Sequence, residues 1–191
     1  MDYGSVLWAP VRSKGDLLLG EEPLRFFTRK AWGLRGKNYW ERLEAFNLSS
    51  NIRRMERYRI MYVWKSLNGL APSLGLEWSE TSNRSGKVLK LPSLSGSARY
   101  KTLQLKSIKC EGAKFFNVIP EPLKVWTGKK EVFKKGLDLF LAMLPDQPET
   151  EMMKPNCSDY SGNASNSIVD WARVLDTRRL LEEENRRGEP D

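Results

Sequence analysis

Three clusters of basic side chains carry the chemistry that this sequence offers. They lie in residues 53–65, 129–130 and 134–135, and their members are Arg53, Arg54, Arg57, Lys65, Lys129, Lys130, Lys134 and Lys135. Arg and Lys neutralise phosphates, and unpaired bases stack on aromatic rings such as those near the first cluster, Tyr39, Trp40, Tyr58 and Trp64. The clusters therefore predict a nucleic-acid site. The alternative is a set of solvated basic faces without a ligand, with about half of these rings in the core.

Catalytic groups are harder to find, because the 191-residue chain contains no histidine. This excludes a Ser/His/Asp triad, a Cys/His dyad and a Cys/His zinc finger. Cys110 and Cys157 are too few for a four-ligand structural zinc site, and we expect free thiols in a reducing compartment, with a disulfide between them left open. Glycine-rich phosphate loops and paired carboxylates on a rigid framework are also missing. We expect no catalytic site, no metal and no cofactor, so the chain is not an enzyme by itself.

Charge divides the chain into two parts. Residues 1–145 carry a net charge of +13, and residues 146–191 carry −5, which together give the formal +8 of the chain. We therefore expect a basic domain over residues 1–145 and an acidic linker and tail over residues 146–191, with a polyanion as the partner of the basic domain. A signal peptide and a long apolar run are not seen, which favours a cytoplasmic or nuclear protein without a membrane partner.

Hydrophobic periodicity predicts a mainly α fold. It indicates a small helical domain with a short β-hairpin, followed by a partly disordered tail with one weak helix. Gly20 and Pro23 are expected to break residues 16–30 into two short pieces, since proline inside a helix costs about 3 kcal/mol. Residues 88–91 are expected to form a strand that pairs with residues 102–108. Helices are expected over residues 39–46, 50–68, 112–119, 130–144 and, in the tail, 167–184.

The helix over residues 50–68 is the strongest of these elements. At about 100° per residue its apolar side chains fall within an arc of about 120°; they are Ile52, Ile60, Val63, Trp64 and Leu67. The basic side chains Arg53, Arg57, Arg54 and Lys65 extend from one edge of this arc into the adjoining arc. Such a helix packs on a core through one face and reaches phosphates from its edge.

Several phrases, taken in order, resemble one known family. They are residues 3–10 (YGSVLWAP), 25–29 (RFFTR) with 33–34 (GL), 39–43 (YWERL), 53–57 (RRMER), 65–70 (KSLNGL), 112–117 (GAKFFN) with Pro120, 133–138 (FKKGLD) and 145–146 (PD). Together they are similar to the region that follows the polymerase core in reverse transcriptases of non-LTR retrotransposons, the LINE elements of the jockey and related groups. The resemblance covers about residues 2–146, and residues 166–168 (NSI) are similar to a tail phrase of the same proteins.

The resemblance implies a part of an RNA-directed DNA polymerase without its chemistry. In that family the catalytic carboxylates belong to the palm, whose Tyr/Phe-Ala-Asp-Asp motif is not in this sequence. The implied fragment is the thumb-side helical region after the palm, which holds template RNA or the primer–template duplex through backbone contacts of low sequence specificity. Met1 falls inside the family pattern and is expected to be an internal methionine of a longer ancestral reading frame.

Two departures from the family pattern point to a decayed or truncated copy without activity of its own. Gly20 and Pro23 interrupt a region where the family runs a continuous helix, and residues 51–55 (NIRRM) replace a Leu-Glu-Arg-Arg-Arg-like phrase. The second hypothesis is a helical protein-interaction or structural module that docks on a reverse transcriptase polymerase core.

Overall fold

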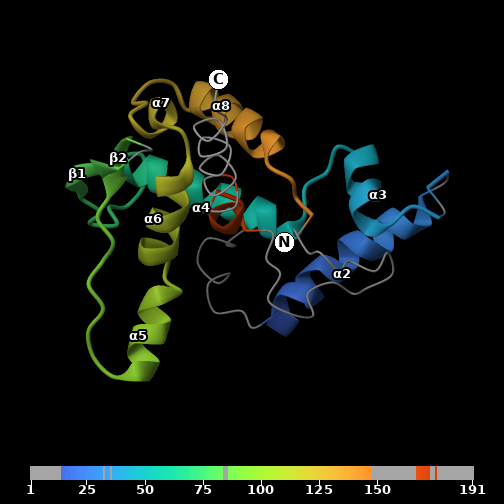
Figure 1. Ribbon diagram of the computed structural model, residues 1–191, viewed down its shortest axis with the longest axis horizontal. Coiled ribbons are helices and arrows are strands. Elements are labelled where there is room, and N and C mark those ends of the chain that lie inside the picture. The colour runs from blue at the N-terminus through green and yellow to red at the C-terminus, as the bar shows by residue number, and fades with distance from the viewer. Residues whose placement is uncertain are drawn as a thin grey trace, which may run out of the picture.

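The computed structural model describes residues 14–31, 33–34, 36–83, 86–147, 167–172 and 175. Its elements, in chain order, are α2 (Lys14–Lys30), α3 (Tyr39–Ala45), α4 (Asn51–Leu67), β1 (Trp78–Asn83), β2 (Gly86–Leu89), α5 (Ala98–Leu105), α6 (Ile108–Val118), α7 (Glu121–Lys124) and α8 (Lys130–Met143). The described part is mainly helical with one antiparallel two-stranded hairpin, so the predicted fold class is confirmed (Figure 1). Most of the predicted linker and tail lies outside the described residues.

Helix α4 runs through the centre of the molecule and organises the fold. It begins where the Ser50 Oγ accepts a hydrogen bond from the Arg53 amide, 3.2 Å away, and ends before Gly69, whose φ of 70° suits glycine. Its bounds match the prediction for residues 50–68. Ile60, Val63 and Trp64 of the predicted apolar face are fully buried, whereas Ile52 is only half-buried.

The main apolar core lies where the second half of α4 meets α6 and α8. Trp64 stacks on Phe133 of α8 with the ring centroids 4.7 Å apart, and its indole Nε1–H donates to the Trp126 carbonyl at 2.7 Å. Gly112 permits the close approach of α6, because a Cβ at this position would lie 2.8 Å from the Val63 Cγ2. The predicted helices over residues 112–119 and 130–144 are thus confirmed, and their apolar faces form this core.

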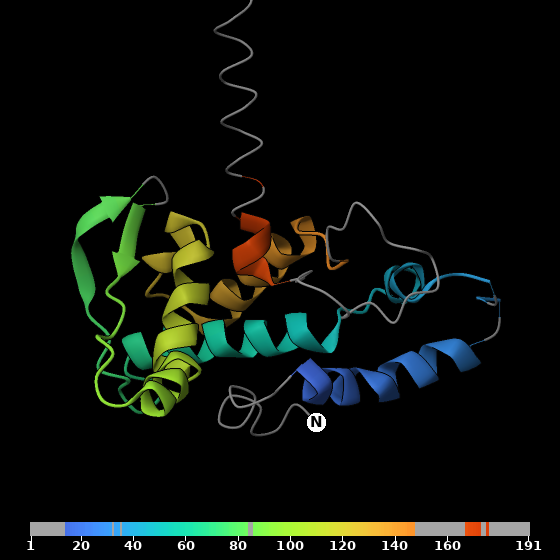
Figure 2. The same cartoon turned by 60° about the horizontal axis from the view of Figure 1, so that its bottom comes forward.

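Helix α2 corrects the prediction of two short pieces. It continues through Gly20 and Pro23 as one helix of 17 residues. The reason is tertiary: Glu21, Arg25 and Thr28 are buried, so contacts with neighbouring elements outweigh the local cost of proline. Figure 2 shows α2 running beside the start of α4.

Helix α3 forms a second, smaller apolar cluster with α2. Its Asn38 and Glu41 make a capping box, and Tyr39, Trp40 and Leu43 are buried together against Leu24. Phe46, the last residue of the predicted helix, is 37% exposed, because the helix ends at Ala45 and Asn47 turns the chain with a φ of 51°.

The hairpin corrects the predicted strand pairing. The strand expected at residues 88–91 exists as β2, but its partner is β1, with Trp78 opposite Leu89 and Asn83 opposite Gly86. Residues 102–105 instead belong to α5 and Ile108 begins α6, because Ser97 caps the start of α5 and Ser107 that of α6. The Leu89 amide donates to Asn117 Oδ1 at 2.6 Å, and Asn117 Nδ2 donates to the Leu89 carbonyl at 2.9 Å, so α6 binds the end of β2.

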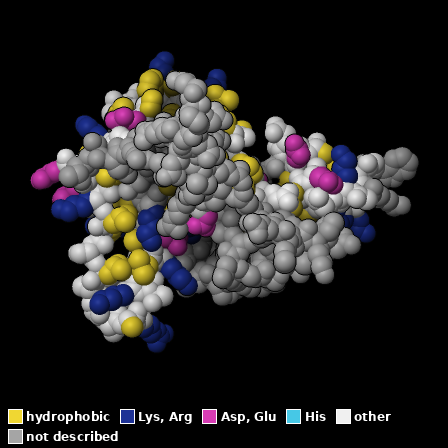
Figure 3. All heavy atoms as spheres, in the orientation of Figure 1, with side chains coloured by type: hydrophobic (Ala, Val, Ile, Leu, Met, Phe, Trp, Pro, Cys, Tyr) yellow, Lys and Arg dark blue, Asp and Glu magenta, His cyan; other side chains and the backbone are white. Residues whose placement is uncertain are grey.

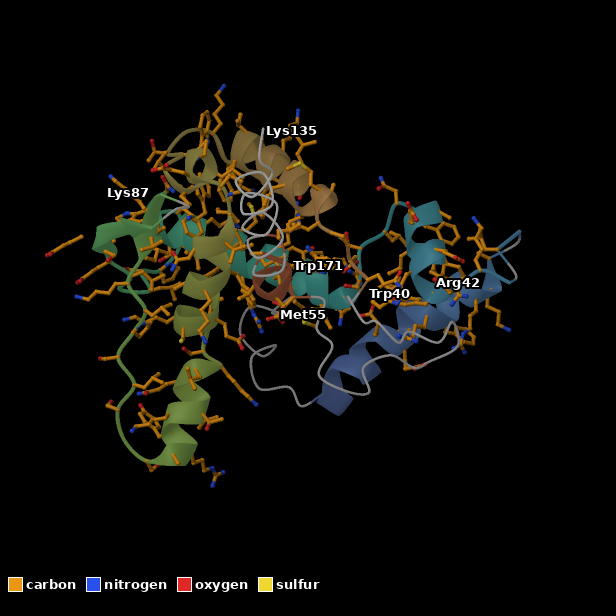
Figure 4. All side chains as sticks on the ribbon, viewed as in Figure 1. Trp40, Arg42, Met55, Lys87, Lys135 and Trp171 are labelled. Atoms are coloured by element: carbon orange, nitrogen blue, oxygen red, sulfur yellow. The ribbon has the colours of Figure 1, made fainter. Side chains whose placement is uncertain are left out.

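Part of the predicted tail helix is also described. Residues 168–172 are helical, and Ile168 and Trp171 are buried, Ile168 within the main core. Figure 4 places Trp171 over the middle of α4. Among the described residues, no helix has the length and apolar character needed to cross a membrane.

Candidate nucleic-acid interface

A hollow between α4 and α8 brings together predicted residues from two separate clusters. Arg54 and Arg57 reach it from α4 and Lys135 from α8, where the side chain projects from the outer face of the helix (Figure 4). The volume of the hollow is ≈ 690 Å³, and the turn at residues 47–49 closes one end. The basic clusters at residues 53–57 and 134–135, which are far apart in the sequence, therefore share one surface.

Arg57 is fixed at the side of this hollow by an ion pair. Its Nε and Nη2 donate to the two carboxylate oxygens of Asp138 at 2.5 and 2.9 Å, and the guanidinium lies 5.8 Å from the Tyr58 ring centroid. The hydrogen bond to Asp138 raises the pKa of Arg57, so the group stays charged. Because Asp138 neutralises part of this charge, the exposed Lys135 supplies more of the attraction for an anion than Arg57 does.

Arg53 has a different place from the one predicted. Its side chain is 3% exposed; Nη2 donates to the Pro145 carbonyl at 2.7 Å, and Nε lies 3.6 Å from Asp146 Oδ1. Although it borders the hollow, its guanidinium faces acceptors within the protein. Arg53 therefore ties α4 to the chain after α8, and we no longer place it among the residues that contact phosphates.

The remaining predicted cations lie elsewhere on the surface. Lys129 and Lys130 are exposed at the start of α8, with Lys130 3.8 Å from Glu131, and Lys134 is exposed on the same helix outside the lining of the hollow. Lys65 is half-buried in the last turn of α4, whereas the hollow is lined by residues 53–58 in the first half of that helix. The structure thus joins one lysine of the α8 clusters to the α4 cluster and leaves the others apart.

Of the four aromatic residues considered for stacking, Tyr58 alone borders the hollow. Tyr58 is half-buried, whereas Tyr39, Trp40 and Trp64 are buried in the two apolar clusters. The alternative expected from the sequence placed about half of these rings in the core, and three of the four are buried there.

Two carboxylates at the start of α4, the buried Glu21 and the partly buried Asp146, are the polar groups that sequence reasoning missed. Asp146 accepts from the amide and the hydroxyl of Ser50 at 2.5 and 2.7 Å. Glu21 accepts from the Asn51 amide at 2.9 Å and from the Tyr39 hydroxyl. Burial raises the pKa of Glu21 despite these bonds. Both acids lie far from residue 50 in sequence; the only local signal was a helix start with free amides, which attracts anions.

Glu56 extends this polar region toward the tail segment. It is 2% exposed, and its Oε2 accepts a hydrogen bond from the Ile168 amide at 3.2 Å. Burial raises its pKa to about 7, although hydrogen bonds with Ser167 and Ile168 and the charge of Arg53 act in the other direction. These contacts hold the start of the 168–172 helix against α4.

The described residues offer few side chains for metal binding or thiol chemistry. Those residues include no group of three or more His, Cys, Asp or Glu side chains placed to hold a metal ion. Cys110 is a buried free thiol in α6, and Cys157 lies outside the described residues.

Known proteins offer no direct guide to this arrangement. Comparison of the chain with protein-family models, with curated proteins and with solved structures finds no significant match.

Proposed function

We propose that this chain is a non-catalytic, thumb-side fragment of a non-LTR retrotransposon reverse transcriptase that binds template RNA or primer–template duplex. The observation that carries the binding proposal is the hollow between α4 and α8, where Arg54, Arg57 and Lys135 meet from two basic clusters. The ordered phrases of the sequence support the choice of nucleic acid and the family origin.

The geometry supports contacts with the sugar–phosphate backbone rather than with base edges. Lys135 is exposed, Arg54 is half-buried, and both line the hollow together with the Tyr58 ring. Phosphate contacts position a nucleic acid without reading its sequence. We therefore expect binding of low sequence specificity that weakens as salt rises, because each neutralised phosphate releases counterions.

A salt titration with a matched variant tests this proposal. Binding of a fluorescent primer–template duplex is measured from 50 to 300 mM salt for the wild type, for Arg54→Ala/Lys135→Ala and for Arg29→Ala/Lys30→Ala, which removes the same charge from exposed positions on α2. The hollow variant is expected to bind about tenfold more weakly and to lower the salt slope by roughly 2, at about 0.9 per phosphate contact. Equal effects of the two variants, or no affinity at low salt, would contradict the proposal.

A second candidate function is docking on a polymerase core. It is favoured by Phe26 and Phe27 of α2, which are 63% and 59% exposed and adjacent in the chain. Exposed apolar patches mark interaction surfaces in many proteins. If Phe26→Ser/Phe27→Ser abolished association with a reverse transcriptase core while the Arg54/Lys135 variant kept full nucleic-acid affinity, docking would be the better account.

A further inference from the structure

Helix α5 is a helix without a packed face. None of its eight residues is buried, and Tyr100, Leu103 and Leu105 are 54%, 49% and 38% exposed. Local hydrogen bonds hold it: Ser97 Oγ accepts from the Tyr100 amide, and the Thr102 hydroxyl donates to the Ala98 carbonyl. Figure 1 shows that it projects from the body at the far end of α6. We call α5 and its C-cap residue Lys106 the α5 arm.

The charge around the arm has one sign. Residues 86–110 contain no acidic residue and six basic ones, Lys87, Lys90, Arg99, Lys101, Lys106 and Lys109. The next acid, Glu111, is held 2.6 Å from the Arg59 guanidinium and so is engaged within the fold. On the face shown in Figure 3, the α5 region carries basic and apolar side chains and no acidic ones. This surface complements a polyanion.

The arrangement of apolar residues on the arm favours a nucleic acid over an anionic membrane. At ~100° per residue, Leu103 lies ~60° to one side of Tyr100 and Leu105 ~140° to the other. A helix that lies in a membrane interface needs its apolar residues on one face. Arg99 and Lys101 precede and follow Tyr100, so one cation lies about 100° to each side of the half-exposed ring around the helix. Basic groups and an exposed ring on one short helix can bind phosphates and stack on bases.

We propose that the α5 arm is a second nucleic-acid contact surface, separate from the hollow between α4 and α8. The inference rests on the proposed function for the class of ligand, but it uses none of the residues of the hollow. Phosphates contact Arg99, Lys101 and Lys106, and the Tyr100 ring stacks on a base where the strand is unpaired.

The test compares two triple variants of the full chain that remove the same charge. One is Arg99→Ala/Lys101→Ala/Lys106→Ala in the arm, and the other is Arg29→Ala/Lys30→Ala/Lys37→Ala at exposed positions near the opposite end of the molecule. Fluorescence anisotropy gives the affinity for a 20-base-pair primer–template duplex over a range of salt. The arm variant is expected to bind at least tenfold more weakly at low salt, with a salt slope lower by about 2 to 3; the control is expected to change affinity less than threefold.

Equal affinities of the two triple variants would overturn the arm proposal. It would also be overturned if the arm variant lost binding to phosphatidylserine vesicles but kept its affinity for the duplex. The Arg54→Ala/Lys135→Ala variant distinguishes failure of the arm proposal from failure of the proposed function. If only this variant binds the duplex more weakly, the arm proposal alone is rejected. If the wild type binds no duplex, both proposals are rejected. Because α5 buries no side chain, the arm variant is expected to melt at the wild-type temperature. A second control, Arg99→Lys/Lys101→Arg, keeps the charge of the arm and is expected to keep the wild-type affinity.

Discussion

The two halves of α4 lie in opposite surroundings. Around residues 60–67, side chains such as Ile60, Val63 and Trp64 pack into an apolar core with α6 and α8. Around residues 51–59, charged groups meet instead: the buried Glu21 from α2, the partly buried Asp146 from the chain after α8, and the buried Arg53 and Glu56 of α4 itself. One helix therefore joins an apolar region to a charged one.

The difference teaches what each half contributes. Apolar burial stabilises in proportion to the area removed from water and tolerates many partners of similar size. A buried charge is costly unless its partners are placed well, so the charged half contributes little net stability. Its hydrogen bonds do select the segments that meet, because Ser50, Asn51 and Ile168 each need one particular carboxylate.

The largest loss of stability is expected from a substitution in the apolar half of α4. Trp64→Ala removes a fully buried ring that stacks on Phe133, and we expect a loss of about 4 kcal/mol in the free energy of unfolding. Chemical denaturation followed by circular dichroism measures it. The control is Leu139→Ala on α8, where the side chain is 70% exposed and a change within about 0.5 kcal/mol is expected. Similar losses for both variants would contradict this account of the core.

The next effect breaks the charged half. Arg53→Ala leaves Asp146 and the Pro145 carbonyl without the buried guanidinium, and we expect a loss of about 3 kcal/mol in stability. Arg57→Ala removes a more exposed ion pair and should cost about 0.5 kcal/mol. If Arg53 has the structural role, folded Arg53→Ala protein keeps wild-type duplex affinity; a drop equal to that of the Arg54/Lys135 variant would return Arg53 to the interface.

The charged half of α4 is also expected to make the stability of the protein depend on pH. The pKa of Glu56 is raised to about 7 in the folded protein, so its contribution to stability is fully present below the unfolded pKa of 4.5 and is lost as pH rises through 7. We expect Glu56→Gln to remove about 2 kcal/mol of the stability change between pH 5 and pH 8, from the size of the shift. Denaturation at several pH values measures it.

Glu21 and Glu111 leave a residual pH dependence of the same sign, since burial raises both of their pKa values. A Glu111→Gln variant serves as the comparison, because it removes another carboxylate whose pKa is raised by burial, one that pairs with Arg59. An unchanged pH profile in Glu56→Gln would contradict the assignment of the titration to Glu56.

Much of the fold could be predicted from local patterns, and the candidate site only in part. The helical spacing of apolar residues located α4 and α8. Their basic side chains were visible as well. That Arg54, Arg57 and Lys135 would share one hollow, and that Arg53 would be turned inward, depends on how α4 crosses α8. The strand predicted over residues 102–108 was wrong, because a partial alternation of apolar residues also fits a short exposed helix.

The sequence by itself determined the excess of basic charge, the lack of histidine chemistry and the helices whose apolar faces repeat with the helical period. Only the tertiary structure decided the continuity of α2 through Pro23, the pairing of β2, and which cations face solvent. These features differ in range: periodicity and caps act within a few residues, whereas the Asp146 carboxylate accepts a hydrogen bond from Ser50, 96 positions away in the chain. Which side chains are free to contact a ligand is settled only when such distant partners have met.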